Sequence, residues 1–288
     1  MTNLFNYIDR PSPIHRLTGA TKLVCLLLWS FASMVTYDTR LLIFMPAASF
    51  FLFYLSKIRL KDVSFMLGMT AVFMVLNNVM VFVFSPQHGV TLYGSKSVLF
   101  TIAGPYVVTK EQLFYHLNLV LKYLAAIPMV ILFVSTTNPS EFAASLNRIG
   151  VSYKISYSVA LALRYIPDIQ REYHDISQSQ QARGIEMSKK VSLVKRLKAA
   201  SAILIPLILS SMDRIEVISN AMELRSFGKN KKRTWYMARR FTAADIASMA
   251  FCAALLVFAI VDVVMMGSRF YNPFYTNIFL KRLIIYHC

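Results

Sequence analysis

Apolar residues in this chain gather into five long runs, which are separated by polar or charged segments. Each run approaches the roughly 20 apolar residues that an α-helix needs to cross a lipid bilayer. The runs cover residues 23–36 with their flanks, 41–56, 63–84, 113–134 and 243–266. Because a bilayer offers the backbone no hydrogen-bonding partners, each run is predicted to be helical. The pattern therefore predicts an all-α integral membrane protein with about five transmembrane helices.

The stretch between the fourth and fifth runs has a different pattern, in which apolar positions recur at helical spacing among many charged residues. It predicts a cytosolic region of long helices, the last of which covers residues 199–225 and extends about 40 Å. Proline removes a helical hydrogen bond, so Pro167 is expected to break or kink its helix. Pro139, Pro167 and Pro206 are therefore candidate hinges.

These patterns divide the chain into four regions. Residues 1–137 are predicted to form an N-terminal membrane region with four spans and an outer loop at about residues 85–111. The cytosolic helices occupy residues 138–242, and the last span occupies residues 243–268. The C-terminal tail, residues 269–288, is short and charged, so it is expected to rest on the outer face of the membrane.

The outer loop contains two β-prone pieces, residues 90–93 and 98–102, with glycines between and after them. This arrangement predicts a β-hairpin, although the loop is equally compatible with an irregular lid. Thr109 is followed three residues later by Gln112, a spacing typical of a capping box at the start of a helix. We therefore expect the fourth span to begin there.

The net charge of +17 is distributed unevenly along the chain. Eighteen of the 31 lysines and arginines lie between Asn138 and Thr242, and the N-terminal 22 residues also carry three. Such an excess is typical of segments on the cytoplasmic side of a membrane. The distribution predicts a multi-pass membrane protein with its N-terminus and its charged stretch in the cytoplasm. It favours attraction to lipid surfaces over nucleic-acid binding.

Few residues suggest chemistry inside the apolar runs. Lys122 and Asp262 are expected near the ends of their spans, where long side chains reach the interface. Asn77 and Asn78 are suited to hydrogen bonds between helices. The five histidines include no pair four residues apart, so no metal site is expected. No phosphate-binding Walker A pattern occurs either, which argues against ATP hydrolysis by this chain.

Two arginines in the charged stretch share a local setting. The first belongs to the triplet Ala182, Arg183 and Gly184, and the second to Leu224, Arg225 and Ser226, with Gly228 shortly after. Each arginine ends a helix-compatible run. A helix C-terminus favours a cation, and a following glycine readily ends the helix. Two such ends in one cytosolic region predict a pair of contacts with a partner rather than a catalytic site.

Several motifs in this order resemble the transmembrane T component of energy-coupling factor (ECF) transporters, the EcfT/CbiQ family. The resemblance covers most of the chain and rests on residues 11–17, 21–22, 136–139, 163–167, 181–184 and 221–228. Both family triplets are of the Ala-Arg-Gly type. The second triplet departs from that pattern here, since Leu224 and Ser226 flank the retained Arg225.

The resemblance implies a non-catalytic transport subunit that joins two cytosolic ABC ATPases to a small membrane-embedded S component. The ATPases would bind ATP and receive the two arginine-tipped helices, so no cofactor is expected in this chain. The S component would bind the substrate, which is a vitamin, a metal such as cobalt, or another micronutrient. Its expected platform is the apolar faces of residues 153–165 and 199–209, unless these faces pack only on each other.

Two alternatives come from other classes of protein. An intramembrane enzyme would need acids, histidines or a nucleophile that converge inside the spans, and the sequence shows no such set. A self-sufficient secondary transporter would show paired repeats with broken helices and buried ionisable groups, and no internal repeat is visible. Transport by the isolated chain would favour this second alternative.

Overall fold

The computed structural model describes residues 10, 12–103, 106–185, 192–230, 234–235, 239–266 and 269–273. The chain divides into two compact units. The membrane unit comprises Met1–Asn138 and Arg240–Cys288, and the long-helix unit comprises Pro139–Arg239. Most of the C-terminal tail, residues 274–288, lies outside the described residues, so its predicted place at the membrane surface stays a prediction.

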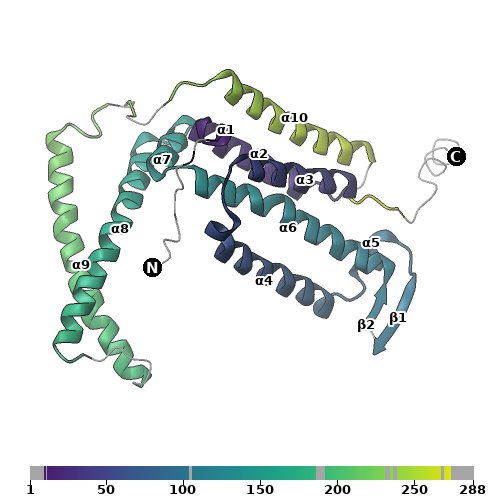
Figure 1. The fold of residues 1–288 in the computed structure, drawn as a ribbon, viewed down its shortest axis with the longest axis horizontal. Coiled ribbons are helices and arrows are strands. Elements are labelled where there is room, and N and C mark those ends of the chain that lie inside the picture. The colour runs from purple at the N-terminus through teal and green to yellow at the C-terminus, as the bar shows by residue number, and fades with distance from the viewer. Residues whose placement is uncertain are drawn as a thin grey trace. The chain divides into compact units, whose positions relative to one another are not determined.

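The membrane unit is built almost entirely from helices (Figure 1). Three of its described helices are long and apolar enough to cross a membrane, whereas α2 and α3 have 17 residues each. All five apolar runs form helices, and the prediction of an all-α membrane protein is confirmed. Its elements are α1 (Pro13–Arg16), α2 (Gly19–Val35), α3 (Thr39–Leu55), α4 (Leu60–Phe84), α5 (His88–Tyr93), β1 (Val98–Ala103), β2 (Tyr106–Thr109), α6 (Lys110–Thr136) and α10 (Ala243–Met266).

Four helices of this unit share one apolar core, because α10 packs on α2 and α3 packs on α6. Pro128 has no N–H, so within α6 the carbonyl of Leu124 lacks its usual donor. Ser49 of α3 donates to this carbonyl at 3.3 Å, and the indole of Trp29 in α2 donates to the next carbonyl, that of Ala125, at 2.9 Å. Neighbouring helices thus satisfy the interrupted backbone.

The outer loop differs from the predicted hairpin. Residues 90–93 belong to the short helix α5, and the hairpin instead pairs β1 with β2 in antiparallel register. Thr109 does cap α6, since its hydroxyl accepts from the amide of Gln112 at 3.2 Å. The Gln112 side chain accepts a hydrogen bond from the amide of Gly89 at 2.7 Å, and this bond attaches α5 to α6.

The polar residues of the apolar helices contact neighbouring elements. Asn78 of α4 shares a 3.0 Å hydrogen bond with His116 of α6, as expected of an interhelical residue, whereas Asn77 is exposed. Lys122 lies midway along α6 and not near its end. Its ammonium donates at 3.2 Å to the carbonyl of Met34, in the last turn of α2, where a cation is favoured. Asp262 lies one turn before the end of α10.

The long-helix unit contains α7 (Pro139–Arg148), α8 (Tyr153–Ala182) and α9 (Leu193–Leu224). Of the predicted break or kink at Pro167, the break is wrong, because the 30-residue helix α8 continues through this residue, and the kink stays a prediction. Likewise α9 runs through Pro206 for 32 residues and begins six residues before the predicted start at residue 199. One missing hydrogen bond does not end a helix whose other turns are intact. Pro139 is the first residue of α7, where an N–H is not needed.

Candidate functional site

The first arginine lies at a fully formed helix end. The helix α8 stops at Ala182, and Arg183 is its C-cap residue. Gly184 follows with φ +86°, a left-handed conformation that suits glycine. Its amide donates to the carbonyl of Gln181 at 3.0 Å, and the amide of Ile185 donates to Gln180 at 3.1 Å. This pair of bonds is the Schellman motif, as the arginine and glycine predict.

The second arginine lies at a helix end with the same backbone geometry. The helix α9 stops at Leu224 with Arg225 as its C-cap residue, and Ser226 takes the left-handed conformation at φ +54°. The amide of Ser226 donates to Glu223 at 2.8 Å, and that of Phe227 donates to Met222 at 3.0 Å. Serine therefore closes this helix in place of the expected glycine, and Gly228 lies beyond the motif.

The six predicted site residues, Ala182, Arg183, Gly184, Leu224, Arg225 and Ser226, are all exposed. No hydrogen bond or ion pair between described residues involves the guanidinium of Arg183 or Arg225. Each guanidinium thus carries five donors and a positive charge at a helix C-terminus. This arrangement suits a carboxylate of a partner, which a guanidinium can bind with two parallel hydrogen bonds.

The two arginines belong to separate sites. The helices α8 and α9 are antiparallel, because Glu172 of α8 contacts Arg214 of α9 while Phe227, just beyond α9, contacts Tyr153 at the start of α8. Figure 1 shows this crossed pair. Tyr153 and Arg183 are the two ends of α8, which extends about 45 Å.

The Arg225 tip is fastened by aromatic side chains. The ring of Phe227 lies 5.5 Å from that of Tyr153 and 4.7 Å from that of Tyr157. Trp235 adds to this cluster, since its ring lies 6.5 Å from Tyr157 and its indole donates to Asn147 of α7 at 3.0 Å. The end of α9 is therefore held against the adjoining ends of α7 and α8.

A charged cluster joins α8 and α9 where they cross. The Glu172 carboxylate accepts hydrogen bonds from the hydroxyl of Ser210 and, at 2.6 Å, from the guanidinium of Arg214. The bond from Ser210, followed by the bond and charge of Arg214, holds the pKa of Glu172 below its ordinary value near 4.5, although desolvation opposes them. The guanidinium of Arg214 also lies 5.8 Å from the centre of the Tyr165 ring. The sequence does not reveal this cluster, because no local signal pairs residues about 40 positions apart.

One face of α9 is apolar and open. Leu204, Ile205, Ile208 and Leu209 are each about half exposed, whereas Ile203 is buried. These four side chains stay exposed within the described part of the chain, and the predicted platform stays a prediction. Within that same part, no three histidine, cysteine, aspartate or glutamate side chains are placed to hold a metal ion.

Comparisons with known proteins identify a family for this chain. Residues 10–236 match the family described as cobalt transport protein, CbiQ. The energy-coupling factor transporter transmembrane protein EcfT of Thermosediminibacter oceani is 27% identical over 264 residues, covering 89% of this chain and 96% of that protein. The EcfT of Leuconostoc gelidum subsp. gasicomitatum is 31% identical over 172 residues, which are 57% of this chain and 62% of that protein. A Bifidobacterium longum protein named for ABC transporter ATP binding is 28% identical over 163 residues, 54% of this chain and 20% of that protein.

Proposed function

Because this chain belongs to the CbiQ cobalt transport protein family, we propose that it is the transmembrane energy-coupling subunit of an ECF-type ABC importer. It links ATP hydrolysis by two cytosolic ATPases to a small membrane-embedded S component that holds the substrate. The observation that carries the proposal is the pair of arginine-capped helix ends, which share one backbone geometry although their sequences differ.

Each arginine tip enters a groove of one ATPase and pairs with carboxylates there. A guanidinium suits this role because its planar fork of donors matches a carboxylate, whereas a lysine ammonium presents a single point charge. Since the tips end two separate helices, each can engage its own ATPase subunit. The name of the Bifidobacterium relative supports this pairing, because a segment similar to this chain occurs within a protein named for ATP binding.

The crossed helices transmit motion from the ATPases. Closure of the ATPase pair on ATP displaces the two tips relative to each other, and the contacts of Glu172 with Ser210 and Arg214 keep the helices joined at their crossing. The open apolar face around Ile205 and Leu209 binds the S component and rotates it between outward-facing and inward-facing orientations. Pro167 and Pro206 supply bending points along the two helices.

The protein itself is non-catalytic, and ATP is bound and hydrolysed by its partners. It resides in the bacterial cytoplasmic membrane, with its N-terminus and long-helix unit in the cytosol, because the basic residues concentrate there. The transported substrate is a vitamin, a transition metal such as cobalt, or another micronutrient, and its binding pocket belongs to the S component.

Charge reversal at the tips tests this function. The tagged chain is co-expressed with its candidate ATPases, and the amount of each ATPase that co-purifies is measured. Arg183→Glu and Arg225→Glu should each weaken the association by about tenfold or more, and the double variant should abolish it, because each replaces an attraction with a repulsion. Arg171→Glu is the matched control, since Arg171 is an exposed residue of α8 away from the tip. Wild-type yield of both ATPases with the double variant would contradict the proposal.

A further inference from the structure

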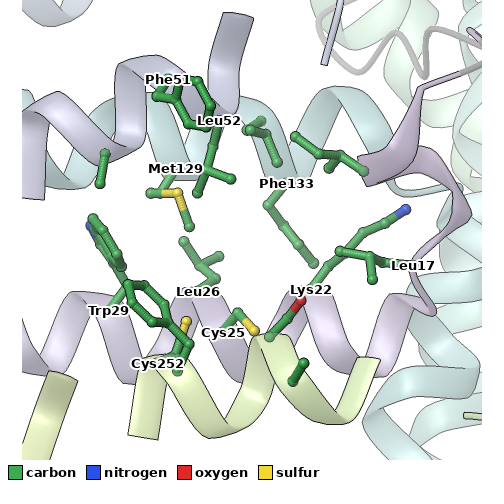
Figure 2. A pocket seen from close by; sticks show the side chains of 16 residues that line it. Leu17, Lys22, Cys25, Leu26, Trp29, Phe51, Leu52, Met129, Phe133 and Cys252 are labelled. Atoms are coloured by element: carbon green, nitrogen blue, oxygen red, sulfur yellow. The ribbon is translucent and has the colours of Figure 1, made fainter. Parts of the chain in front are cut away.

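An apolar cavity of about 420 Å³ lies inside the membrane unit, among α1, α2, α3, α6 and α10 (Figure 2). Its size falls within the range of about 300–1,000 Å³ that is typical of small-molecule sites. Its walls are almost wholly apolar, and they include Trp29, Leu52, Met129 and Phe133. No part of the proposed ATPase coupling uses this cavity.

The cavity opens toward the outside of the helix bundle. Two of its lining side chains, Phe51 of α3 and Phe251 of α10, are more than half exposed. Since α6 and α10 are long and apolar enough to cross a membrane, a bilayer around them would place hydrocarbon next to this opening. An apolar ligand can therefore enter from the membrane.

Water would be poorly stabilised inside this apolar cavity. A buried water molecule needs two to four polar partners, and the lining side chains other than Lys22 and Ser248 are apolar or contribute a thiol. An empty apolar cavity of this volume would leave its lining without packing partners and would destabilise the fold. An acyl chain from the membrane needs no polar partners, and it would pack against the lining side chains.

One end of the cavity is basic. Figure 2 shows the Lys22 ammonium beside Leu17, at the end opposite Trp29. Lys22 is buried and donates to the carbonyl of Thr136 at 2.8 Å. The exposed Arg16 lies between two lining residues in sequence, Ile14 and Leu17. The carboxylate of Asp245 also lies near this end, where it accepts from the amide of Thr18 at 2.8 Å. With two cations and one anion nearby, the net charge favours a negative group at this end of the ligand.

We propose that this cavity binds an anionic phospholipid from the membrane. One acyl chain occupies the apolar space between Trp29 and Phe133, and the phosphate lies at the basic end formed by Lys22 and Arg16. The lipid then fills the junction of five helices and acts as a structural ligand of the membrane unit. This inference needs only that the chain is a membrane protein, so it stands apart from the proposed coupling of ATPases.

Native mass spectrometry of the full chain in detergent tests the site. Palmitoyl-oleoyl phosphatidylglycerol is titrated into the protein, and phosphatidylcholine with the same acyl chains is titrated in parallel. We expect one phosphatidylglycerol to bind at least about tenfold more tightly than phosphatidylcholine, because nearby basic residues attract the anionic headgroup. Arg16→Glu should remove most of this preference while leaving the binding of phosphatidylcholine unchanged.

A cavity-filling variant and a matched neighbour make the test specific. Ala48 lines the cavity, whereas Ala47 is exposed on the same helix and does not. Ala48→Phe should abolish tight lipid binding and the accompanying rise in unfolding temperature, and Ala47→Phe should preserve both. The unfolding temperature of Ala48→Phe without lipid verifies that the variant is folded.

Three results would overturn the proposal. The first is equal binding of the two lipids by the wild type, and the second is equal phosphatidylglycerol binding by the Ala48 and Ala47 variants. The third is an Ala48→Phe variant that still binds phosphatidylglycerol but no longer co-purifies with the S component. The cavity would then belong to the interface with the S component. Loss of ATPase association by the arginine variants bears on the proposed function alone.

Discussion

Ser226 has a backbone conformation that normally favours glycine. Its φ of +54° brings the Cβ close to the following carbonyl, which costs about 1–2 kcal/mol for an ordinary residue. Gly184 has the equivalent position at the other tip without this cost. The two helix ends therefore share one hydrogen-bond pattern, and the end at Arg225 is the more strained.

Replacing the serine should relieve this strain. We expect Ser226→Gly to slow hydrogen exchange in the last turn of α9, with a local stabilisation of about 1 kcal/mol. Ser226→Ala is the matched control, because it retains a Cβ and should give no gain. Gly184→Ser should have the opposite effect on the last turn of α8. Equal exchange for the glycine and alanine variants at position 226 would show that the turn is unstrained.

Glu172 should make the stability of the long-helix unit depend on pH. The pKa of its carboxyl is lowered in the folded protein, so the ionised form favours folding above pH 4.5, and this contribution disappears as the pH falls through the folded pKa. The side chains of Glu172 and Arg214 are partly exposed, so we expect Glu172→Gln to cost only about 1 kcal/mol at neutral pH.

Thermal unfolding between pH 3 and 7 measures this effect. The difference between wild type and Glu172→Gln should be largest at neutral pH and should shrink below about pH 4.5. Asp168→Asn is the control, because its pair with Arg171 is an exposed contact of 3.8 Å. A difference that stays constant across this pH range would exclude titration of Glu172 as its source.

At the scale of elements, the packing of Phe227 decides whether the Arg225 tip is rigid. Its ring contacts Tyr153 and Tyr157, so Phe227→Ala should loosen the end of α9 and weaken binding of one ATPase severalfold. Because Phe227 acts through the position of Arg225, the substitution should add little in an Arg225→Glu background. A double-mutant cycle on ATPase affinity tests this coupling, and additive effects would show that the two residues act independently.

The elements also show where sequence patterns suffice. The apolar runs located the membrane helices to within a few residues, since a span requires a long apolar stretch. The arginine and glycine of the first triplet placed the end of α8 correctly. The strand assigned to residues 90–93 failed because a short β-prone piece does not determine its own structure, and α5 depends on the distant contact between Gly89 and Gln112.

At the scale of the whole molecule, the helix ends were predictable and the crossing of α8 and α9 was not. A Schellman motif depends on a few consecutive residues, so Arg183 and Gly184 are sufficient to indicate it. The contact of Glu172 with Ser210 and Arg214 depends on how two helices pack, which local patterns do not specify. The same limit applies to the cavity, whose walls come from five separate helices.

The orientation of the whole chain gives a final prediction, because the basic residues of the long-helix unit should remain in the cytosol. Lys96, in the outer loop, and Asn230, just beyond the Arg225 tip, are both exposed. We expect a membrane-impermeant thiol reagent to label Lys96→Cys in intact cells and to label Asn230→Cys only after the cells are opened. Cys25 and Cys252 are buried and can stay in place, so a Cys288→Ser background provides the control for unspecific labelling. Labelling of position 230 in intact cells, with position 96 protected, would mean that the protein is inserted in the opposite orientation.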